Sequence, residues 1–482
     1  MTKGSGSMDD LDRYDALGLG DLVRCGETSA EQLLDRAIAR VEAINPKINA
    51  VVLPHYEVAR RQLAQGRPEG PFAGVPFLLK DLGAALTGTI TTDGSRAFAD
   101  WTAKADSTIT RRAKAAGLTI FGKTASPEFG LTTSTESKLW GATRNPWNLE
   151  RIAGGSSGGA AAAVAARILP MAHASDGGGS IRIPAACCGL FGLKPSRGRV
   201  PYNPGAGIGW NGLSTQHAVT ISVRDSAALL DALSGPERGD SVVPPKAHGA
   251  FLEAAGKAPK RLRIALVEAA PTGVPLHPDC KAALADAAAL CESLGHRVEP
   301  ATLSLDASAI AAAFGVCISV DIFNRLERRA AEIGRPVRED ELETVSWMMA
   351  QRGRTATGQA YADARRTFDV AAVEVGRLLE AYDLFLSPTL AEPPGPLGRL
   401  GLSPANLGDY GRAIGAFSPY TALQNQTGVP AMSVPLSWNA EGLPIGVMFT
   451  AAFAREDVLF SLAGQLEAAR PWADRRPPVC AA

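Results

Sequence analysis

The sequence has few of the residues that metal sites, disulfide frameworks and nucleic-acid interfaces use. Its 482 residues include six histidines and seven cysteines, scattered without a C-x-x-C spacing or an H-E-x-x-H pair. This scatter gives no sign of a zinc site or of a disulfide framework. We therefore expect no metal and no cofactor, and the cysteines fit a reducing, cytoplasmic compartment.

Neither sign of charge is in excess, and long apolar runs are lacking. The 49 basic residues balance 49 acidic ones, so no positive surplus points to nucleic acid or to an anionic membrane. No apolar run reaches 18 residues, and the N-terminus is polar instead of basic and then apolar. We expect no nucleic-acid partner, no membrane span and no secretory signal, and we interpret residues 1–7 as an expression scar or a frayed tail.

Alternating strand-like and helix-like segments indicate the fold class. At about 150 residues per domain the length first suggests about three domains, and 46% apolar residues are enough for a large core. We predict an α/β protein with one large mixed β-sheet covered by helices on both faces. The predicted strands are 74–80, 118–122, 168–174, 262–267, 383–386, 431–435 and 445–450.

The clearest predicted helix covers residues 28–44. Apolar side chains recur there at helical spacing, and Ser29 and Gln32 can form a capping box. Asn45 and Pro46 are predicted to stop this helix, because proline lacks the N–H group that a continuing helix uses.

Strand-like segments near both ends of the chain change the domain expectation. They need partners, and the simplest arrangement places them in one sheet, so we predict one domain overall. Its predicted parts are an N-terminal helical segment (9–70), a core segment (71–235), a helix-rich elaboration that shapes a pocket (236–395) and a C-terminal segment that completes the core (396–482).

Two glycine- and serine-rich clusters carry the strongest chemical signal. The first, AGGSSGG, contains Ser156, and the second, DGGGS, ends at Ser180. A helix-like and a strand-like segment separate them, which predicts both serines at loops on the same side of the sheet. Glycine permits positive φ and close backbone approach, so the N–H groups of Gly177, Gly178 and Gly179 could form an oxyanion hole beside Ser180.

Lys80 is the predicted base for a serine nucleophile. A serine hydroxyl is weak until a base activates it, and between the clusters only His173, inside an apolar strand, is available. Lys80 ends a buried strand, where burial would lower its pKa towards the range of a general base. Two serines and this lysine together predict nucleophilic acyl transfer.

An alternative interpretation makes Ser156 the nucleophile of an α/β-hydrolase. The sequence around it also fits the G-x-S-x-G elbow, which needs a histidine later in the chain. The available histidines are His217, His248, His277 and His296. None of them lies in a motif, and this interpretation leaves the second cluster unexplained.

Five longer motifs resemble the amidase signature family of Ser-cisSer-Lys hydrolases. They are GVPFLLKD around Lys80, GGSSGG at 154–159, DGGGSIRIPA at 176–185, GLKPSRGR at 192–199 and GLPIGV at 442–447. They are ordered and spaced over nearly the whole chain. The resemblance implies the amidase signature fold and a triad in which Ser180 attacks the carbonyl and Ser156, in a cis peptide, relays the proton to Lys80.

The resemblance also implies supporting roles and a partner. The N–H groups of Gly177 to Ser180 match the family's oxyanion hole, and Ser157 matches a serine that holds the lysine network together. Asp176 and Arg182 match supports of the loop. Many relatives carry a larger residue in place of Gly177, a departure that would loosen the hole or enlarge the pocket. The implied partner is a small-molecule amide substrate, and a homodimer is the assembly that the family suggests.

Two further motifs narrow the resemblance. WGATRNPWN at 140–148 and SWMMAQR at 346–352 resemble the branch that contains 6-aminohexanoate cyclic-dimer (nylon-oligomer) hydrolases. The implied function is hydrolysis of C–N amide bonds, linear or cyclic, in small or oligomeric substrates through an acyl-enzyme, with carbamates and esters as further candidates. The alternatives are a glutaminase-like subunit of a tRNA-dependent amidotransferase and a non-catalytic binding protein.

Cys317, Trp347 and Phe417 are the predicted substrate-binding residues, with Phe314, Met348 and Tyr420 as further candidates for the same pocket. The first two lie in the helix-rich stretch, and Phe417 follows the Pro/Gly-rich segment 391–413, which we interpret as a surface loop and a candidate lid. Apolar residues at helical spacing more often belong to a core than to a pocket.

Overall fold

The computed structural model describes residues 8–66, 68–203 and 208–481, so residues 1–7, interpreted above as a scar or tail, lie outside the described residues. The strands are β1 (Val51–Pro54), β2 (Pro76–Lys80), β3 (Thr119–Thr124), β4 (Glu136–Ser137), β5 (Gly141–Ala142), β6 (Arg144–Asn145), β7 (Asn148–Ile152), β8 (Met171–Asp176), β9 (Phe191–Lys194), β10 (Thr215–Thr220), β11 (Arg263–Leu266), β12 (Arg297–Pro300), β13 (Leu384–Pro388), β14 (Ala431–Trp438) and β15 (Pro444–Ala451).

The α-helices connect and cover these strands. They are α1 (Ala16–Cys25), α2 (Ala30–Ile48), α3 (Tyr56–Ala64), α4 (Thr108–Ala115), α5 (Gly158–Ala165), α6 (Arg182–Cys188), α7 (Gly209–Gly212), α8 (Val223–Leu233), α9 (Phe251–Ala255), α10 (Pro278–Ser293), α11 (Ala307–Ile333), α12 (Thr344–Thr355), α13 (Gly358–Ala381), α14 (Leu407–Phe417), α15 (Leu423–Thr427) and α16 (Glu456–Ala469). Short 3-10 helices are η1 (Met8–Arg13), η2 (Arg96–Phe98), η3 (Glu128–Gly130) and η4 (Glu339–Glu341).

A large mixed sheet forms the centre of the molecule, as predicted. In the described residues it has eight strands in the order β12-β11-β13-β15-β14-β9-β10-β8. β11 runs parallel to β12 and β13, and the other pairs are antiparallel. The late strand β14 pairs with β9, with Ala431 opposite Lys194, so early and late parts of the chain share one sheet.

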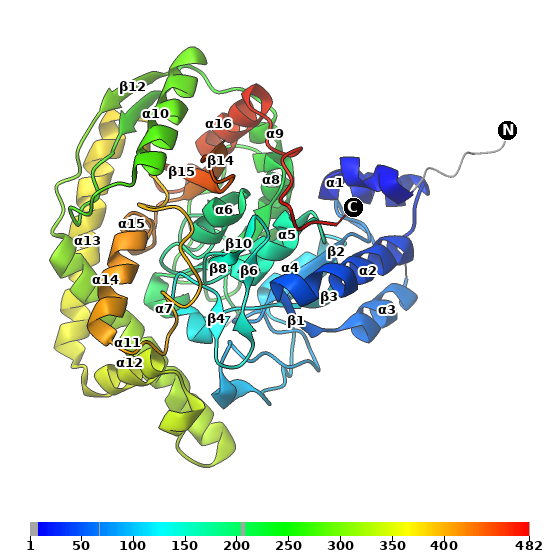
Figure 1. Ribbon diagram of the computed structural model, residues 1–482, viewed down its shortest axis with the longest axis horizontal. Coiled ribbons are helices and arrows are strands. Elements are labelled where there is room, and N and C mark those ends of the chain that lie inside the picture. Colours follow the sequence, from blue (N-terminus) through cyan, green and yellow to red (C-terminus); the bar gives the residue numbers. More distant parts are fainter. Residues whose placement is uncertain (1–7, 67, 204–207, 482) are drawn as a thin grey trace.

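Helices cover both faces of this sheet because its strands alternate between two buried layers. On β15, Val447 and Phe449 belong to a cluster of buried side chains that includes α8, α10 and α16. The backbone of α6 approaches Gly446 on the opposite face of the same strand. Figure 1 shows α1 to α3 on one side of the molecule, with both chain ends, and α11 to α13 on the opposite side.

A small second sheet differs from the prediction of one continuous sheet. The predicted strands 74–80 and 118–122 are β2 and β3, which pair with β1 in the order β1-β3-β2. β2 lies beside β8, the edge strand of the large sheet, and side chains join the two edges. The backbone N–H of Lys80 donates to His173 Nδ1 on β8, at 3.1 Å. This junction places the end of β2 beside the loop that follows β8.

The predicted N-terminal helix is present, but the prediction of its end was wrong. Ser29 and Gln32 form the capping box. The helix continues through Pro46 to Ile48 and ends at Asn49 in the left-handed conformation. Near a C-terminus the fixed φ of proline still fits a helix, and only one backbone hydrogen bond is lost. The carbonyl of Asn45 accepts from Asn49 N, while its side chain accepts from Ala50 N and Val51 N, so the turn after the helix is held in place.

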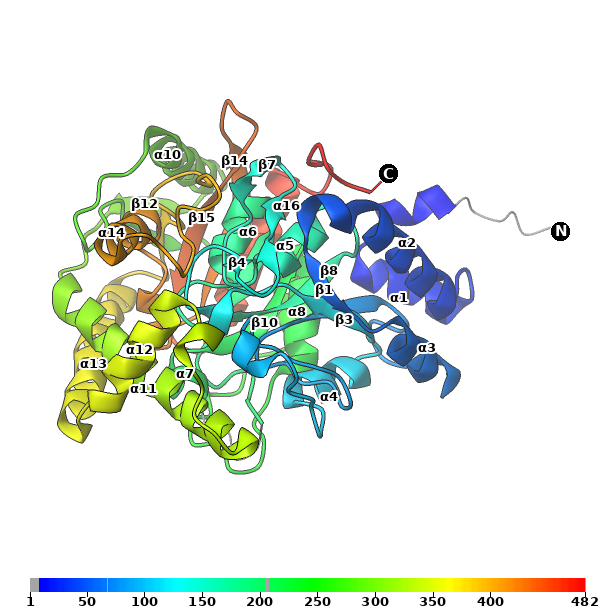
Figure 2. The same ribbon diagram turned by 60° about the horizontal axis from the view of Figure 1, so that its bottom comes forward.

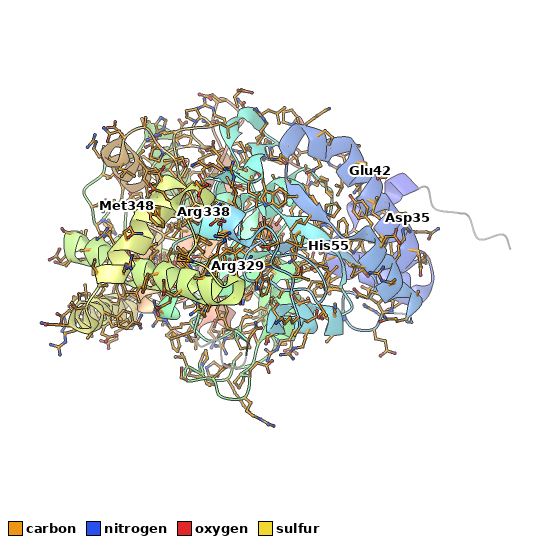
Figure 3. The ribbon with its side chains drawn as sticks, turned by 90° about the horizontal axis from the view of Figure 1, so that it is seen from below. Asp35, Glu42, His55, Arg329, Arg338 and Met348 are labelled. Atoms are coloured by element: carbon orange, nitrogen blue, oxygen red, sulfur yellow. The ribbon has the colours of Figure 1, made fainter. Side chains whose placement is uncertain are left out.

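α11 and α12 form a helical wall opposite the N-terminal helices (Figure 2). Among the described residues, α11 is the one helix that is long and apolar enough, by length and composition alone, to cross a membrane. Arg329, labelled in Figure 3, fastens it to the loop after β2, because its Nε donates to Ala97 O at 2.9 Å. Seen from below, Met348 of α12 and Asp35 of α2 lie on opposite sides of the molecule (Figure 3).

Candidate active site

Lys80 is the buried centre of the site. It ends β2, and its side chain has no exposed surface. Its Nζ donates to Ser156 Oγ at 2.7 Å and to Ser175 Oγ at 3.1 Å. Burial lowers the pKa of Lys80 to about 7, against the opposing attraction of Asp176 and Asp93. Near pH 7 a large share of the amine is therefore neutral, and the neutral amine can accept a proton from Ser156, which it contacts.

Two serines that follow β7 hold the lysine network from one side. Ser156 follows a cis peptide bond from Gly155, as the family resemblance implied, and it is 2% exposed. Ser157 Oγ donates to the carbonyl of Ser175 at 3.2 Å and accepts from Ser175 N at 3.3 Å. Ser157 therefore acts on Lys80 through Ser175, whose hydroxyl contacts the amine.

Ser180 lies in the loop between β8 and α6, which is built from three glycines. Gly179 has a φ of 129°, and the side chain of Thr421 occupies the space that a Cβ at this position would need. The N–H of Gly179 donates to Asp176 Oδ1 at 2.7 Å. In the described part of the chain, the N–H groups of Gly177, Gly178 and Ser180 donate to no protein acceptor. The open donors are therefore these three, and the expected contribution of Gly179 is taken up by Asp176.

A buried ion pair supports this loop from below. Asp176 and Arg182 are fully buried, with 2.9 Å between Oδ1 and Nη2. Burial alone would raise the pKa of Asp176, but Arg182 and the Nδ2 group of Asn425 lower it to about 2. Arg182 also donates to Gln424 Oε1 and Asn425 Oδ1 of α15. The predicted supports are in place, and α15 completes them.

Two cavities meet at Ser180. The apolar cavity has a volume of about 260 Å³ and reaches Ser180 and Gly178. Its apolar wall includes Leu131, Leu305, Ile310, Phe314, Ile318 and Ile414. The polar recess has a volume of about 70 Å³ and also reaches Ser180. Its polar wall includes Ser156, Ser175, Tyr202, Ser214, Gln216 and Arg325.

The three predicted substrate-binding residues do not belong to the walls of these cavities as the structure describes them. Cys317 and Phe417 have no exposed surface, and Trp347 packs against the side chains between α11 and the loop at Phe98. Phe314 on α11 and Ile414 on α14 line the apolar cavity instead, whereas α12, which carries Trp347, contributes no described residue to either wall. Residues three positions apart on a helix differ in direction by only about 60°, so tertiary packing decides which of them reaches the cavity.

The histidines of the alternative interpretation lie away from the serines. His217 is buried on β10 and its Nε2 bonds to Ser226 Oγ at 2.8 Å. His296 bonds to Gln465, and His277 caps α10. None of the four lines either cavity in the described residues. The α/β-hydrolase interpretation therefore lacks a histidine that could act as the general base for Ser156.

The chain matches the protein-family model described as Amidase over residues 32–460. It belongs to the amidase signature family. A relative from Paenarthrobacter ureafaciens, named 6-aminohexanoate-cyclic-dimer hydrolase, is 41% identical over 479 residues, which cover 96% of each chain.

Solved structures of proteins related to this amidase have the same fold. A structure of 6-aminohexanoate cyclic dimer hydrolase complexed with substrate has a TM-score of 0.91 and 39% identity, covering 98% of this chain and 100% of the other. A bacterial aryl acylamidase of the amidase signature family has a TM-score of 0.87 and 28% identity, covering 95% and 97%. The likeness therefore extends over essentially the whole fold.

Sequence reasoning about this amidase missed residues that act across the fold. Ser175 contacts Lys80, and His173 accepts from the Lys80 backbone. Burial lowers the pKa of His173 to about 3, so its ring is neutral and can accept. Asn425 donates to the Asp176 carbonyl, about 250 residues earlier in the chain. Ser175 had a local signal, because it directly precedes the DGGGS motif, but Asn425 had none.

Proposed function

We propose that the protein is an amide hydrolase with Ser180 as nucleophile and Ser156 and Lys80 as its proton relay. The contact that carries this proposal is the 2.7 Å hydrogen bond between the buried Lys80 amine and Ser156, in the recess that Ser180 shares. A lysine with a pKa of about 7 is half neutral near physiological pH.

The proposed cycle conserves protons throughout. Ser180 Oγ attacks the carbonyl carbon while its proton passes to Ser156, whose own proton passes to Lys80. The N–H groups of Gly177, Gly178 and Ser180 stabilise the oxyanion. When the C–N bond breaks, Ser156 protonates the departing nitrogen and Lys80 returns its proton to Ser156. Water then repeats the same steps on the acyl-enzyme and releases the acid.

The proposed substrate has an apolar acyl part. Leucine, isoleucine and phenylalanine side chains surround the cavity that opens at Ser180, and aliphatic surface is stabilised there by burial. The 6-aminohexanoate-cyclic-dimer hydrolase likeness adds cyclic and linear nylon-type amides to the candidates. Glutamine, the substrate of an amidotransferase subunit, would place a charged amino acid in this apolar cavity, which disfavours that alternative.

The direct test labels the nucleophile. A fluorophosphonate probe should label wild type, substrate amides should compete, and Ser180→Ala should remain unlabelled with turnover reduced by at least about 10⁴-fold. A panel of primary amides, nylon-type oligomers, carbamates and esters ranks the substrates by kcat/KM. Full activity in a folded Ser180→Ala variant, or activity only with a partner subunit, would reject the proposal.

A further inference from the structure

The two cavities at Ser180 differ in size and in the residues that line them, and they share two lining residues, Ser180 and Trp210. The apolar cavity has about 260 Å³ and the polar recess about 70 Å³. Trp210 of α7 lies in the wall of both. A change at this indole would therefore change the boundary between the cavities.

Trp210 occupies the space that a side chain at position 177 would take. A Cβ at Gly177 would lie 2.6 Å from the indole Cε3 atom. The next glycine, Gly178, faces Phe314 in the same way, with a Cβ at 3.1 Å from the ring. The unusual Gly177 therefore does not loosen the loop, because the indole fills the vacated volume.

The turn that carries Trp210 is fixed from two helices. Trp210 has a φ of 51°, in the left-handed region that is rare for a bulky residue. The next residue, Asn211, donates from Nδ2 to Cys317 O of α11 at 3.0 Å and accepts from Arg365 of α13 at 2.7 Å. These anchors make the indole a fixed partition.

Reaction chemistry assigns the two cavities to the two halves of an amide. Ser156 must reach the departing nitrogen in order to protonate it, and Ser156 lines the recess. The apolar cavity, as the structure describes it, includes Ser180 without Ser156. The amine therefore leaves through the recess, and the acyl chain occupies the apolar cavity.

The far wall of the recess offers hydrogen bonds without net charge. Arg325 donates to Asp93 at 2.6 Å, so its charge is already balanced. The Tyr202 hydroxyl donates to Ser214 Oγ at 2.6 Å, and burial raises the pKa of this phenol, which keeps it neutral. Such a wall suits an uncharged polar group better than a carboxylate.

We propose that the polar recess is the amine-side subsite, that it accepts ammonia or short uncharged amines, and that Trp210 determines this specificity. The inference rests on the proposed function, because it needs Ser156 as proton donor. It predicts asymmetric substrates, with a large apolar acyl part and a small amine part, and it therefore disfavours the nylon-type candidates, whose departing nitrogen carries a six-carbon chain.

The first experiment varies only the size of the amine. Hexanoyl amides of methylamine and cyclohexylmethylamine have leaving groups of similar basicity, so their kcat/KM ratio reports fit. Wild type should favour the methylamide by about 100-fold, and Trp210→Ala should reduce this ratio at least about tenfold by accelerating the bulky amide. Trp210→Phe should keep most of the preference.

Phe314→Ala is the matched control, because Phe314 covers the neighbouring glycine but lines only the apolar cavity. It should change the preferred acyl length and leave the amine ratio within about threefold. An amine ratio that is the same in wild type, Trp210→Ala and Phe314→Ala would overturn the proposal.

A second experiment needs no variant, in case Trp210→Ala does not fold. Added amines compete with water for the acyl-enzyme: the nitrogen forms the new C–N bond, the Ser180 ester bond breaks, and the amine proton returns to Ser180 through Ser156. Methylamine should yield its amide, whereas cyclohexylmethylamine at the same concentration of free base should yield little amide. Equal trapping by both would overturn the subsite. Absence of both fluorophosphonate labelling and hydrolysis would instead reject the proposed function.

Discussion

The glycine loop around Ser180 and the helical wall of the apolar cavity are held by different forces. The carboxylate of Asp176 accepts from Gly179 N, Ile181 N, Arg182 and Asn425, all in a fully buried setting. The wall instead consists of side chains such as Ile310, which are half-buried and contact the cavity only through apolar atoms.

This difference separates chemistry from specificity. A buried hydrogen-bond network loses several partners when one member changes, because each remaining polar group stays unsatisfied. An apolar wall loses only contact area, and other hydrophobic residues can replace it. Substitutions in the loop should therefore abolish turnover or folding, whereas substitutions in the wall should redistribute substrates.

Removal of the lysine amine should have the largest effect on activity. Lys80→Met keeps the volume of the side chain but removes the acceptor for the Ser156 proton, so kcat/KM should fall by about 10³- to 10⁴-fold. Lys123→Met is the matched control, because Lys123 is also fully buried at a neighbouring strand but bonds to Thr91. The kcat/KM of the folded Lys123→Met protein should fall by less than about tenfold. Equal losses in both variants would indicate that burial, and not the relay, decides activity.

The buried ion pair should have the largest effect on stability. Arg182→Met leaves Asp176 buried without its counterion, and such losses cost about 3–5 kcal/mol in the free energy of unfolding. The exposed pair of Arg412 and Asp409 offers the comparison, and Arg412→Met should change stability by less than about 0.5 kcal/mol. Urea denaturation of both variants measures the difference. A small cost at Arg182 would contradict the idea that the network holds the loop.

The parts of the site that could be predicted from the sequence are those whose signal is local. Lys80 follows an apolar run, and Ser156 and Ser180 lie in contiguous glycine clusters. The large mixed sheet was likewise predictable from its apolar strands. The family resemblance added the order of proton transfer that we propose.

The rest depends on contacts that no local pattern contains. The Lys80 backbone meets His173 only because the edges of two separate sheets lie side by side. Trp210 acts through a turn with a left-handed residue, a conformation that tryptophan does not signal. Phe314 and Cys317 share one helix, and only tertiary packing decides which of them faces the cavity.

The pH profile of kcat/KM should report the pKa of Lys80, the lysine at the end of β2. Because burial depresses the pKa of Lys80 to about 7, the active neutral form exists above that pH and is lost as the pH falls through it. We expect kcat/KM for a non-ionising amide to drop about tenfold for each pH unit below this pKa. A profile that is flat from about pH 5 to 9 would contradict the relay.

A single charge change should shift the pH at which kcat/KM falls. Asp93 attracts the protonated form of Lys80 and raises its pKa, while it also neutralises Arg325. Asp93→Asn removes the attraction and leaves Asp321 as the carboxylate that faces Arg325, so the neutral amine is favoured. The fall in kcat/KM should therefore occur at a lower pH. The substitution suits the backbone, because asparagine tolerates the φ of 53° at this position. A shift to higher pH would be the contrary result.

The smallest effects belong to the wall. Ile310→Ala on α11 should leave the free energy of unfolding within about 1 kcal/mol, because the side chain is only half-buried and faces a cavity. The added space should move the best acyl chain to a longer one, with kcat/KM for that chain rising severalfold over wild type, since each buried methylene adds about 0.8 kcal/mol. Ile414→Ala on α14, which lines the same cavity, should do the same. A series of primary amides of increasing acyl length measures the optimum. If both variants lost activity uniformly at every chain length, the wall would act on the chemistry as the loop does, and the contrast between the two regions would fail.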